Sequence, residues 1–261
     1  MHTGFRDPPK KSLGQHFLHE RGIIDKIVRA IDPQPGDALV EIGPGQGALT
    51  FPLLDAHGAL TAIEFDRDLL TPLAQNAQAH GALHLIHANV LDVDFTALAA
   101  GRMLRLAGNL PYNLSSPILF HALDHAHCIR DMHFMLQKEV VDRMAAAPGS
   151  KVYGRLSVML QAYCRVQALF TVPPGAFRPP PKVDSAVVRL VPRAADSIGI
   201  ADGRRFSAVV RDAFGQRRKT LRNALSAQCD ADAIARAGID PQARAEQLAV
   251  ADFIRLSNAL G

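Results

Sequence analysis

The sequence contains no tryptophan, only three tyrosines and three cysteines, and no long uninterrupted apolar run. Three widely spaced cysteines (Cys128, Cys164 and Cys229) without a Cys-x-x-Cys pair argue against a disulfide framework and a zinc site, so we expect no metal. The apolar runs are too short for a transmembrane helix. The first eleven residues lack the features of a signal or transit peptide. We therefore expect a cytoplasmic protein with no membrane partner.

The composition is ordinary for a globular protein, but the charge is unevenly distributed. Of 261 residues, 48% are hydrophobic and 21% are charged, and the net charge is +4. Between positions 204 and 222, seven basic residues face one acid, Asp212, so this segment carries +6 and the rest of the chain −2. The basic residues are Arg204, Arg205, Arg211, Arg217, Arg218, Lys219 and Arg222. A cluster of this density indicates a polyphosphate partner such as nucleic acid.

The pattern of apolar residues predicts an α/β domain followed by a helical one. From about residue 23 to 190, strand-like and helix-like segments alternate, as in a mostly parallel sheet. An alternating segment at 186–191 predicts a closing antiparallel strand. A linker follows at 192–203, and the remaining segments read as helices. We therefore predict domains at 1–192 and 193–261.

A glycine-rich loop follows the first predicted strand, 38–42, and indicates a nucleotide-like ligand. Gly43, Gly45 and Gly47 alternate with other residues, which allows a sharp turn and a close approach of the backbone to a ligand. Glu64 ends the second strand, nineteen positions after Gly45, where a carboxylate can accept hydrogen bonds from ribose hydroxyls. Both features fit NAD as well as S-adenosylmethionine, so an NAD-dependent oxidoreductase stays open as an alternative.

Glu41 favours S-adenosylmethionine over NAD, and Asn89 and Val90 are further candidate contacts to the ligand. Glu41 directly precedes the loop, where a carboxylate suits a cationic ligand and would repel a pyrophosphate, although it could instead cap the loop's own amides. After the third strand, the Asn89 side chain could accept from an adenine amino group, and the Val90 amide could reach adenine N1. No downstream motif supplies a hydride-transfer site.

Asn109-Leu110-Pro111-Tyr112 follows the fourth predicted strand and indicates methylation of a planar base. The lone pair of adenine N6 is delocalised into the ring. The Asn109 side-chain oxygen and the Leu110 carbonyl could accept its two hydrogens and make the lone pair available. Pro111 stiffens the turn, and Tyr112 offers a face for base stacking. Transfer then needs positioning in a dry pocket more than a strong base.

In their order along the chain, these motifs resemble the 16S rRNA adenine N6,N6-dimethyltransferase family of the KsgA (RsmA) type. The resemblance runs nearly end to end and extends beyond the glycine loop, Glu64 and Asn109–Tyr112. The further matching segments are 11–18 (KSLGQHFL), 137–140 (QKEV), 153–158 (YGRLSV), 177–185 (FRPPPKVDS) and 214–223 (FGQRRKTLRN). It implies a Rossmann-like class I methyltransferase fold with a mostly parallel sheet, plus a small all-helical C-terminal domain.

The resemblance also implies roles for residues that the motifs alone leave open. His16 and Leu18 would contact S-adenosylmethionine, and Phe177 would sandwich the flipped adenine against Tyr112. The basic residues Arg217, Arg218, Lys219 and Arg222 would bind RNA phosphates. One departure is Asn89, where relatives more often have Asp.

The implied substrate is a pair of adjacent adenosines in the 3′-terminal hairpin of 16S rRNA. It would be presented on the immature small ribosomal subunit, with the enzyme acting as a monomer during subunit biogenesis. A large-subunit rRNA adenine methyltransferase and a non-catalytic assembly or transcription factor on the same fold are the alternatives. The full basic C-terminal domain favours the small-subunit enzyme, and the intact motifs argue against a factor without activity.

Overall fold

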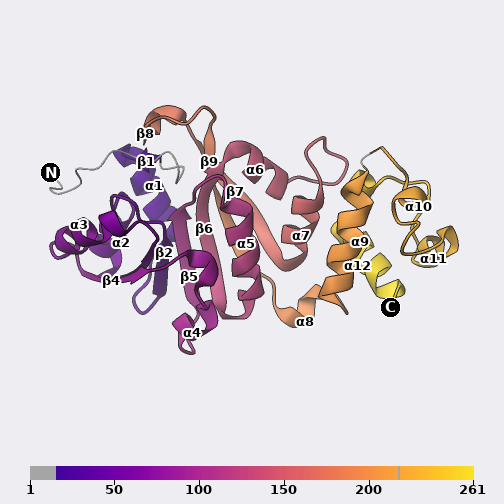
Figure 1. The fold of residues 1–261 in the computed structure, drawn as a ribbon, viewed down its shortest axis with the longest axis horizontal. Helices are drawn as coiled ribbons and strands as arrows, with labels where there is room; N and C mark the ends of the chain where they lie inside the picture. The colour runs from indigo at the N-terminus through magenta and orange to yellow at the C-terminus, as the bar shows by residue number, and fades with distance from the viewer. Residues whose placement is uncertain (1–15, 217) are drawn as a thin grey trace. The chain divides into compact units, whose positions relative to one another are not determined.

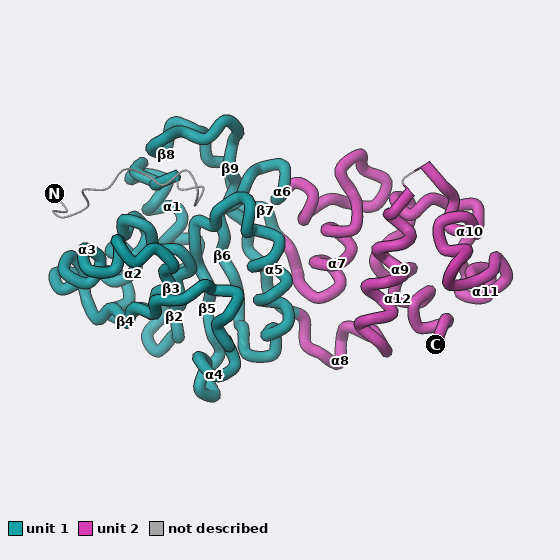
Figure 2. Tube along the Cα trace, in the orientation of Figure 1, with its two compact units in different colours: residues 1–141, 167–192 teal, residues 142–166, 193–261 magenta. Residues whose placement is uncertain are grey.

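A computed structural model describes residues 16–216 and 218–261. The chain forms two compact units, coloured separately in Figure 2. Within the described residues, the first unit ends at Val141 and resumes over Gln167–Pro192. The second comprises Asp142–Val166 and Arg193–Gly261.

A seven-stranded sheet of order β4-β3-β2-β5-β6-β9-β7 forms the framework of the first unit (Figure 1). Its strands are β2 (Ala38–Ile42), β3 (Ala59–Glu64), β4 (Ala82–His87), β5 (Leu104–Asn109), β6 (Ile129–Gln137), β7 (Cys164–Val172) and β9 (Ser185–Pro192). The strands from β4 to β6 pair in parallel, whereas β9 runs antiparallel to β6. The predicted mostly parallel sheet with a closing antiparallel strand is confirmed.

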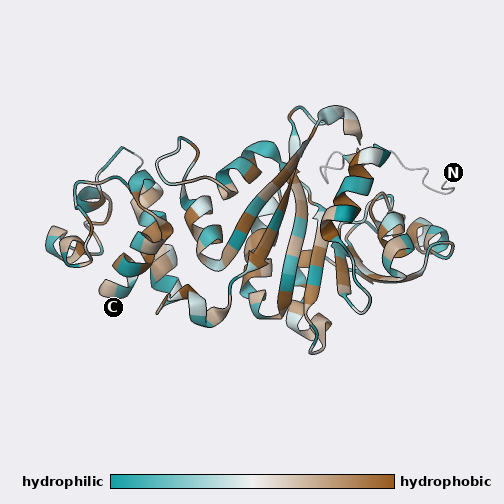
Figure 3. Ribbon diagram, turned by 180° about the vertical axis from the view of Figure 1, so that it is seen from behind, coloured by the Kyte–Doolittle hydropathy of each residue, from teal (hydrophilic) through white to brown (hydrophobic). Residues whose placement is uncertain are grey.

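The helices around these strands are α1 (Arg21–Ile31), α2 (Thr50–His57), α3 (Arg67–Ala77), α4 (Phe95–Ala99), α5 (Ser115–Asp124) and α6 (Lys138–Met144). Helices α2 to α5 connect the parallel strands, whereas α1 precedes β2 and α6 follows β6. Figure 1 shows α5 in front of the sheet. In α1, isoleucines at helical spacing (Ile24, Ile27 and Ile31) form the buried face. The Glu20 carboxylate caps this helix by accepting from the amides of Gly22 and Ile23, so α1 starts before the first apolar position, residue 23. All five residues of β2 are buried, as a central strand covered on both faces requires. Figure 3 shows hydrophobic residues, in brown, along the strands of the sheet.

Two features of the structure are absent from the sequence prediction. A short antiparallel pair, β1 (Phe17–Leu18) with β8 (Phe177–Arg178), joins segments that lie far apart in the chain. The apolar segment at 156–164 becomes a helix, α7 (Arg155–Tyr163), and the strand β7 follows it directly.

The second unit is helical but larger than predicted. Its main helices are α7, α9 (Gly203–Gly215) and α12 (Val250–Ala259), and α8 (Ala195–Ile198), α10 (Leu221–Ala224) and α11 (Ala231–Arg236) are short. The predicted boundary between 192 and 193 coincides with one division of the chain. Residues 142–166, however, group with the second unit instead of the first. The physical reason is that α7 packs against α9 and α12, with the Tyr163 ring 6.1 Å from that of Phe206.

Within the described part of the chain, no helix is long and apolar enough to span a bilayer. Among the same residues, no group of three or more histidine, cysteine or acidic side chains has the geometry to hold a metal ion. Cys128 and Cys164 are buried, Cys229 is partly exposed, and all three thiols are free.

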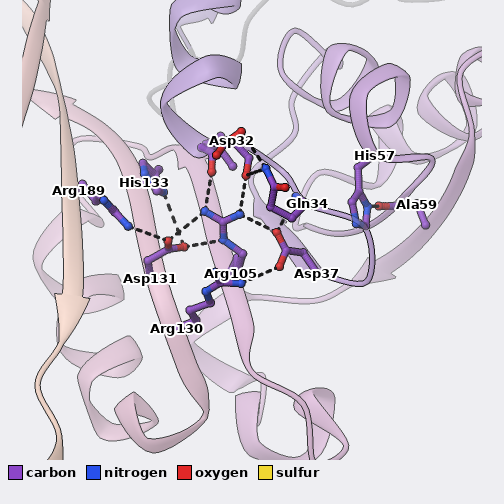
Figure 4. Close-up of polar contacts among 11 residues, drawn as sticks. Asp32, Gln34, Asp37, His57, Ala59, Arg105, Arg130, Asp131, His133 and Arg189 are labelled. Atoms are coloured by element: carbon purple, nitrogen blue, oxygen red, sulfur yellow. Dashed lines mark hydrogen bonds and ion pairs between the residues drawn. The ribbon is translucent and has the colours of Figure 1, made fainter.

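A buried arginine joins β5, β6 and the end of α1 at the amino-terminal edge of the parallel strands (Figure 4). The guanidinium of Arg105, which is 5% exposed, bonds both carboxylate oxygens of Asp131 at 2.9 and 3.0 Å. It also donates to Asp37 at 2.6 Å and to the carbonyls of Ile31 and Asp32 at 2.5 and 3.0 Å. Bidentate pairing of this kind is strong and directional.

The charges around Asp37 hold its carboxylate in the ionised form. Burial opposes ionisation, but the Gln34 amide, the Arg105 guanidinium and the charge of Arg130 together hold the pKa of Asp37 below its usual value. A depressed folded-state pKa adds stability above the unfolded pKa of about 4, and this stability is lost as the pH falls through the folded value. The ion pairs of Asp37 with Arg105 and Arg130 therefore stabilise the folded protein at neutral pH, and this stabilisation is lost in acid.

Replacing Arg105 with methionine should destabilise the protein by about 3–5 kcal/mol, because Asp131 and Asp37 would stay buried without their main cation. Urea unfolding at neutral pH measures this loss. The control is Arg130→Gln, which removes a pair with Asp37 whose arginine side chain is 56% exposed and should cost less than about 1 kcal/mol. Equal losses in the two variants would contradict the role assigned to Arg105.

Candidate active site

A pocket of about 300 Å³ opens at the carboxyl ends of β2, β3 and β5. This is where a parallel α/β sheet binds its ligands, because the loops leaving adjacent strands diverge there. The strand ends and loops that line it contribute Glu41, Gly43, Gly45, Glu64, Asn89, Val90, Asn109, Leu110, Pro111 and Tyr112, and the N-terminal segment adds His16 and Leu18. The structure thus brings together in one cavity every predicted cofactor residue and the whole Asn109–Tyr112 motif.

The glycine loop presents backbone to this pocket. The Gly43 amide donates to the Ile63 carbonyl at 3.0 Å, which ties the loop to the end of β3. Gly45 has a φ of 57°, and a Cβ there would lie 3.2 Å from the Phe17 ring. Gly47 has a φ of 86°, and a Cβ there would collide with the Phe51 ring. Side chains are therefore excluded on steric grounds, which leaves the loop open to a close-fitting ligand.

Glu64 is held by backbone amides on both of its oxygens. One oxygen accepts from the Gly45 amide at 3.1 Å and the other from the Asp66 amide at 2.7 Å. The carboxylate is only 6% exposed, and burial raises its pKa even though these amides oppose the shift. Since a carboxylate oxygen has more than one lone pair, Glu64 can still accept from ligand hydroxyls.

Glu41 is more deeply buried than Glu64, and fewer hydrogen bonds offset the cost of burying its charge. It is 1% exposed, and its one recorded hydrogen bond among the described residues comes from the Thr50 hydroxyl at 2.7 Å. Burial raises the pKa of Glu41 to about 8, and the charge of Glu64 adds to the shift against the effect of Thr50. The alternative that Glu41 caps the amides of its own loop is not observed, because Glu64 takes the Gly45 amide instead. A buried carboxylate with so little compensation fits a cationic ligand.

At the end of β4, Asn89 begins a short turn of 3₁₀ helix over Val90–Asp92. Its side-chain oxygen accepts from the Leu91 amide at 3.2 Å and so caps this turn. Val90 is buried beside it. The Asn89 side chain lines the pocket, but part of its acceptor capacity is already used within the turn.

Phe65 is a pocket residue that the motifs did not identify. It directly follows Glu64, lines the pocket and is 61% exposed, which is unusual for so large an apolar side chain. A sequence signal exists in hindsight: an aromatic residue stands between two acids, Glu64 and Asp66, at the end of a buried strand. Its ring offers an apolar face to a ligand in the pocket, next in sequence to Glu64, the carboxylate predicted to accept from ribose hydroxyls.

The Asn109–Tyr112 motif lies at the carboxyl end of β5, and hydrogen bonds orient its polar groups. The Asn109 amide nitrogen donates to the His16 carbonyl at 3.0 Å, which fixes the side chain and leaves its oxygen as an acceptor. The Leu110 amide donates to the Met135 carbonyl of β6 at 3.2 Å, and the Leu110 side chain is buried. Tyr112 is half-buried, and burial raises its pKa.

The short β1–β8 pair lies against the same motif. Leu18 pairs with Phe177 and Phe17 with Arg178. The His16 ring bonds the Pro179 carbonyl through Nδ1 at 2.7 Å. The same ring stacks on Tyr112, with centroids 5.7 Å apart and planes 25° apart.

The expected role of Phe177, stacking on an adenine opposite Tyr112, stays a prediction, because the Phe177 ring lies away from Tyr112 in this structure. Phe177 is 2% exposed, belongs to the hydrophobic core around Leu18 and Leu49, and is absent from the pocket lining. Burial of a phenylalanine ring stabilises the folded protein by about 1.5–3 kcal/mol, which favours this inward position of Phe177. The pairing of β8 with β1 is compatible with it. The ring that lies on Tyr112 is that of His16.

The basic residues predicted to bind RNA lie in the second unit. Arg218 and Lys219 follow α9 and are exposed, and Arg222 is exposed on α10. Arg217 lies outside the described residues. The buried face of α9, formed by Phe206, Val209, Val210 and Ala213, packs within the unit.

Comparisons with known proteins agree with this site. The family described as ribosomal RNA adenine dimethylase matches residues 6–261. A ribosomal RNA small subunit methyltransferase A of Xanthomonas campestris pv. campestris (strain B100) is 71% identical over 258 residues, which cover 99% of this chain and 98% of the relative. A similar protein of Xanthomonas axonopodis pv. citri (strain 306) is also 71% identical over 258 residues, with the same shares covered.

Solved structures show the same fold. A dimethyladenosine transferase from Plasmodium falciparum matches with a TM-score of 0.81 at 26% identity, covering 92% of this chain and 96% of that one. The 23S rRNA methyltransferase ErmE matches with a TM-score of 0.72 at 24% identity, covering 94% and 99%. The predicted class I methyltransferase fold is confirmed. The chain belongs to the ribosomal RNA adenine dimethylase family.

Proposed function

We propose that this protein transfers methyl groups from S-adenosylmethionine to the exocyclic N6 of adenosines in small-subunit ribosomal RNA. The observation that carries the proposal is the single pocket that unites Glu41, the glycine loop and Glu64 with the Asn109–Tyr112 motif. Family membership and the small-subunit name of the 71% identical relatives support the substrate. More specifically, we propose that the substrate is a pair of adjacent adenosines in the 3′-terminal hairpin of 16S rRNA on an immature small subunit. We also propose that the enzyme acts as a monomer in the cytoplasm.

The donor set of the pocket fits S-adenosylmethionine. Glu41 would compensate the ligand's positive charge, and Glu64 would accept from the ribose hydroxyls. The exposed ring of Phe65 and the side chain of Val90 would enclose the adenine, with the Asn89 oxygen accepting from its amino group. Leu18 and the backbone of His16 would cover the ligand from the β1 side.

When bound, S-adenosylmethionine supplies a methyl group on a sulfonium, a leaving group that needs no metal or acid to depart. The protein's task is to present the nucleophile. The Asn109 oxygen and the Leu110 carbonyl would accept the two N6 hydrogens, so that the nitrogen lone pair points at the methyl carbon. Transfer would form the N–C bond as the S–C bond breaks with its electron pair left on sulfur, and the proton released from N6 would pass to solvent. Tyr112 would stack on the base after its extrusion from the RNA.

The direct test incubates the protein with a mixture of small and large ribosomal subunits that lack adenine dimethylation, together with labelled S-adenosylmethionine. Mapping of modified adenines should find label at two adjacent positions near the 3′ end of 16S rRNA. Label on large-subunit RNA alone would refute the proposed substrate. Preferential binding of NAD over S-adenosylmethionine would refute the reaction.

Asn109→Ala should lower turnover by about 100-fold or more, because misplacement of the reacting nitrogen costs at least this much. Cofactor affinity should fall far less, since the other pocket residues stay in place. Single-turnover methylation and equilibrium binding measure the two effects. Asn76→Ala is the matched control, because Asn76 bonds the Pro72 carbonyl within α3, away from the pocket. Unchanged turnover in Asn109→Ala would remove this residue from the reaction.

Cofactor binding should strengthen with rising pH by up to about tenfold per unit and level off near the Glu41 pKa of about 8. The sign follows from linkage: the free protein holds a proton on Glu41 below this value, and a cationic ligand favours the ionised form, so binding releases that proton. Calorimetric titrations in buffers of different ionisation enthalpy count the protons released. In Glu41→Gln this component should vanish, while titration of the ligand's own amino group is common to both proteins.

Neutralising Arg218 and Lys219 to glutamine should weaken subunit binding and flatten the dependence of log affinity on log salt. The slope should fall by about 0.7–0.9 for each RNA phosphate that these side chains neutralise in the wild type. Binding titrations over a range of salt concentrations measure this slope. The control replaces Arg29 and Arg102, two exposed arginines of the first unit, by glutamine. If both double variants change the slope equally, the effect reflects net charge and not phosphate binding at 218–219.

A further inference from the structure

Tyr112 is held at two points of its side chain by residues from distant parts of the chain. Its hydroxyl shares a 2.7 Å hydrogen bond with the Ser185 hydroxyl, and its ring stacks on His16 with an interplanar angle of 25°. His16 is in turn fixed by its ring bond to the Pro179 carbonyl and by the Asn109 amide on its backbone.

The two contacts constrain different motions of the ring. The tyrosine hydroxyl lies on the ring's long axis, so a bond there fixes the direction of that axis but allows the ring to turn about it. A stacked neighbour opposes this turning, because the ring faces would separate. Ser185 therefore sets where the ring points and His16 sets its plane. Since stacking requires near-parallel faces, both settings matter for a base that must lie on Tyr112.

Ser185 is suited to hold the ring because it is itself rigidly placed. It is fully buried, begins β9 and pairs with Gln137 of β6. The same strand β6 pairs with β5, where Asn109 lies opposite Met135. The Ser185 hydroxyl and the Asn109 side chain are thus positioned from one strand, β6, which keeps the stacking face and the N6 acceptor in a common frame.

We propose that Ser185 is a positioning residue, which orients Tyr112 for methyl transfer through the hydroxyl–hydroxyl bond without touching the base. The proposal rests on the function proposed above and adds to it a residue from the FRPPPKVDS segment. The family resemblance assigns the role of that segment to Phe177, which is buried elsewhere in the core.

A double-mutant cycle tests the proposal, using Tyr112→Phe, Ser185→Ala and the combined variant. Tyr112→Phe keeps the ring and loses the bond, and Ser185→Ala removes the same bond from the other side. Each should lower kcat by about 3- to 10-fold, the range expected for one hydrogen bond, with cofactor affinity changed less than about 2-fold. The combined variant should be no slower than either single one, because the same bond is absent from all three. Losses that multiply, or single variants with full turnover, would overturn the proposal.

Tyr153→Phe is the matched control. It makes the same chemical change at a buried tyrosine of the second unit, whose hydroxyl donates to the Leu248 carbonyl at 2.9 Å. Its turnover should equal that of the wild type. If Ser185→Ala fails to fold, Tyr112→Phe still removes the bond while leaving β9 unaltered, and an equally large loss in the Tyr153→Phe control would overturn the proposal.

The chain's three tyrosines and lack of tryptophan allow a readout that does not depend on activity. With ring-labelled tyrosine, the Tyr112 resonances are identified by their loss in Tyr112→Phe. Ser185→Ala should shift these resonances and leave those of Tyr153 and Tyr163 in place. A wild type that transfers no methyl to adenine would refute the proposed function. An unchanged Tyr112 signal in Ser185→Ala, with an active wild type, would refute this inference alone.

Discussion

The buried pair between Arg105 and Asp131 is the interaction on which the geometry of the site depends. The two residues are register partners on β5 and β6, so their bidentate bond fixes how these strands are aligned. Four residues further along β5, on the same face of the strand, comes Asn109. A slip of one residue would turn Asn109 to the other face of the sheet and separate it from the pocket. The chemistry at one end of β5 therefore depends on a charge pair at the other.

The same arginine also binds the carboxyl end of α1. Its guanidinium donates to the carbonyls of Ile31 and Asp32 at the carboxyl end of α1, where the helix dipole adds negative potential. This helix follows almost directly on β1, and Leu18 of β1 and the preceding His16 line the pocket. One buried cation thus anchors both the strand that ends in Asn109 and the helix that follows β1. The ion pairs and hydrogen bonds of Arg105 at the amino-terminal edge of the sheet thus help to position the side chains that line the pocket at the carboxyl-terminal edge.

Much of this arrangement could be predicted from local sequence patterns. The features that could not be predicted lack a clear local pattern or depend on contacts between distant segments of the chain. Glu64 and Asn109 each end a strand with a clear apolar pattern, and the glycine loop follows another. The parallel topology places the carboxyl ends of these three strands at one edge. The strand β7 escapes prediction because its residues vary irregularly between buried and exposed, and the apolar run before it does not distinguish strand from helix. The β1–β8 pair has two residues per strand, too few for any periodic signal, and it joins positions about 160 residues apart.

The distribution of charge is compatible with the proposed binding of both a cationic cofactor and a polyanionic RNA. Glu41 and Glu64 are buried, so RNA phosphates cannot approach them closely, and the raised pKa of Glu41 further reduces its charge while the pocket is empty. Arg218, Lys219 and Arg222 are exposed and set the field that a polyanion meets at long range. A cationic ligand entering the pocket would ionise Glu41 and so cancel its own added charge. Under the proposed function, burial would let the two carboxylates bind a cation without weakening the attraction of the exposed basic residues for RNA.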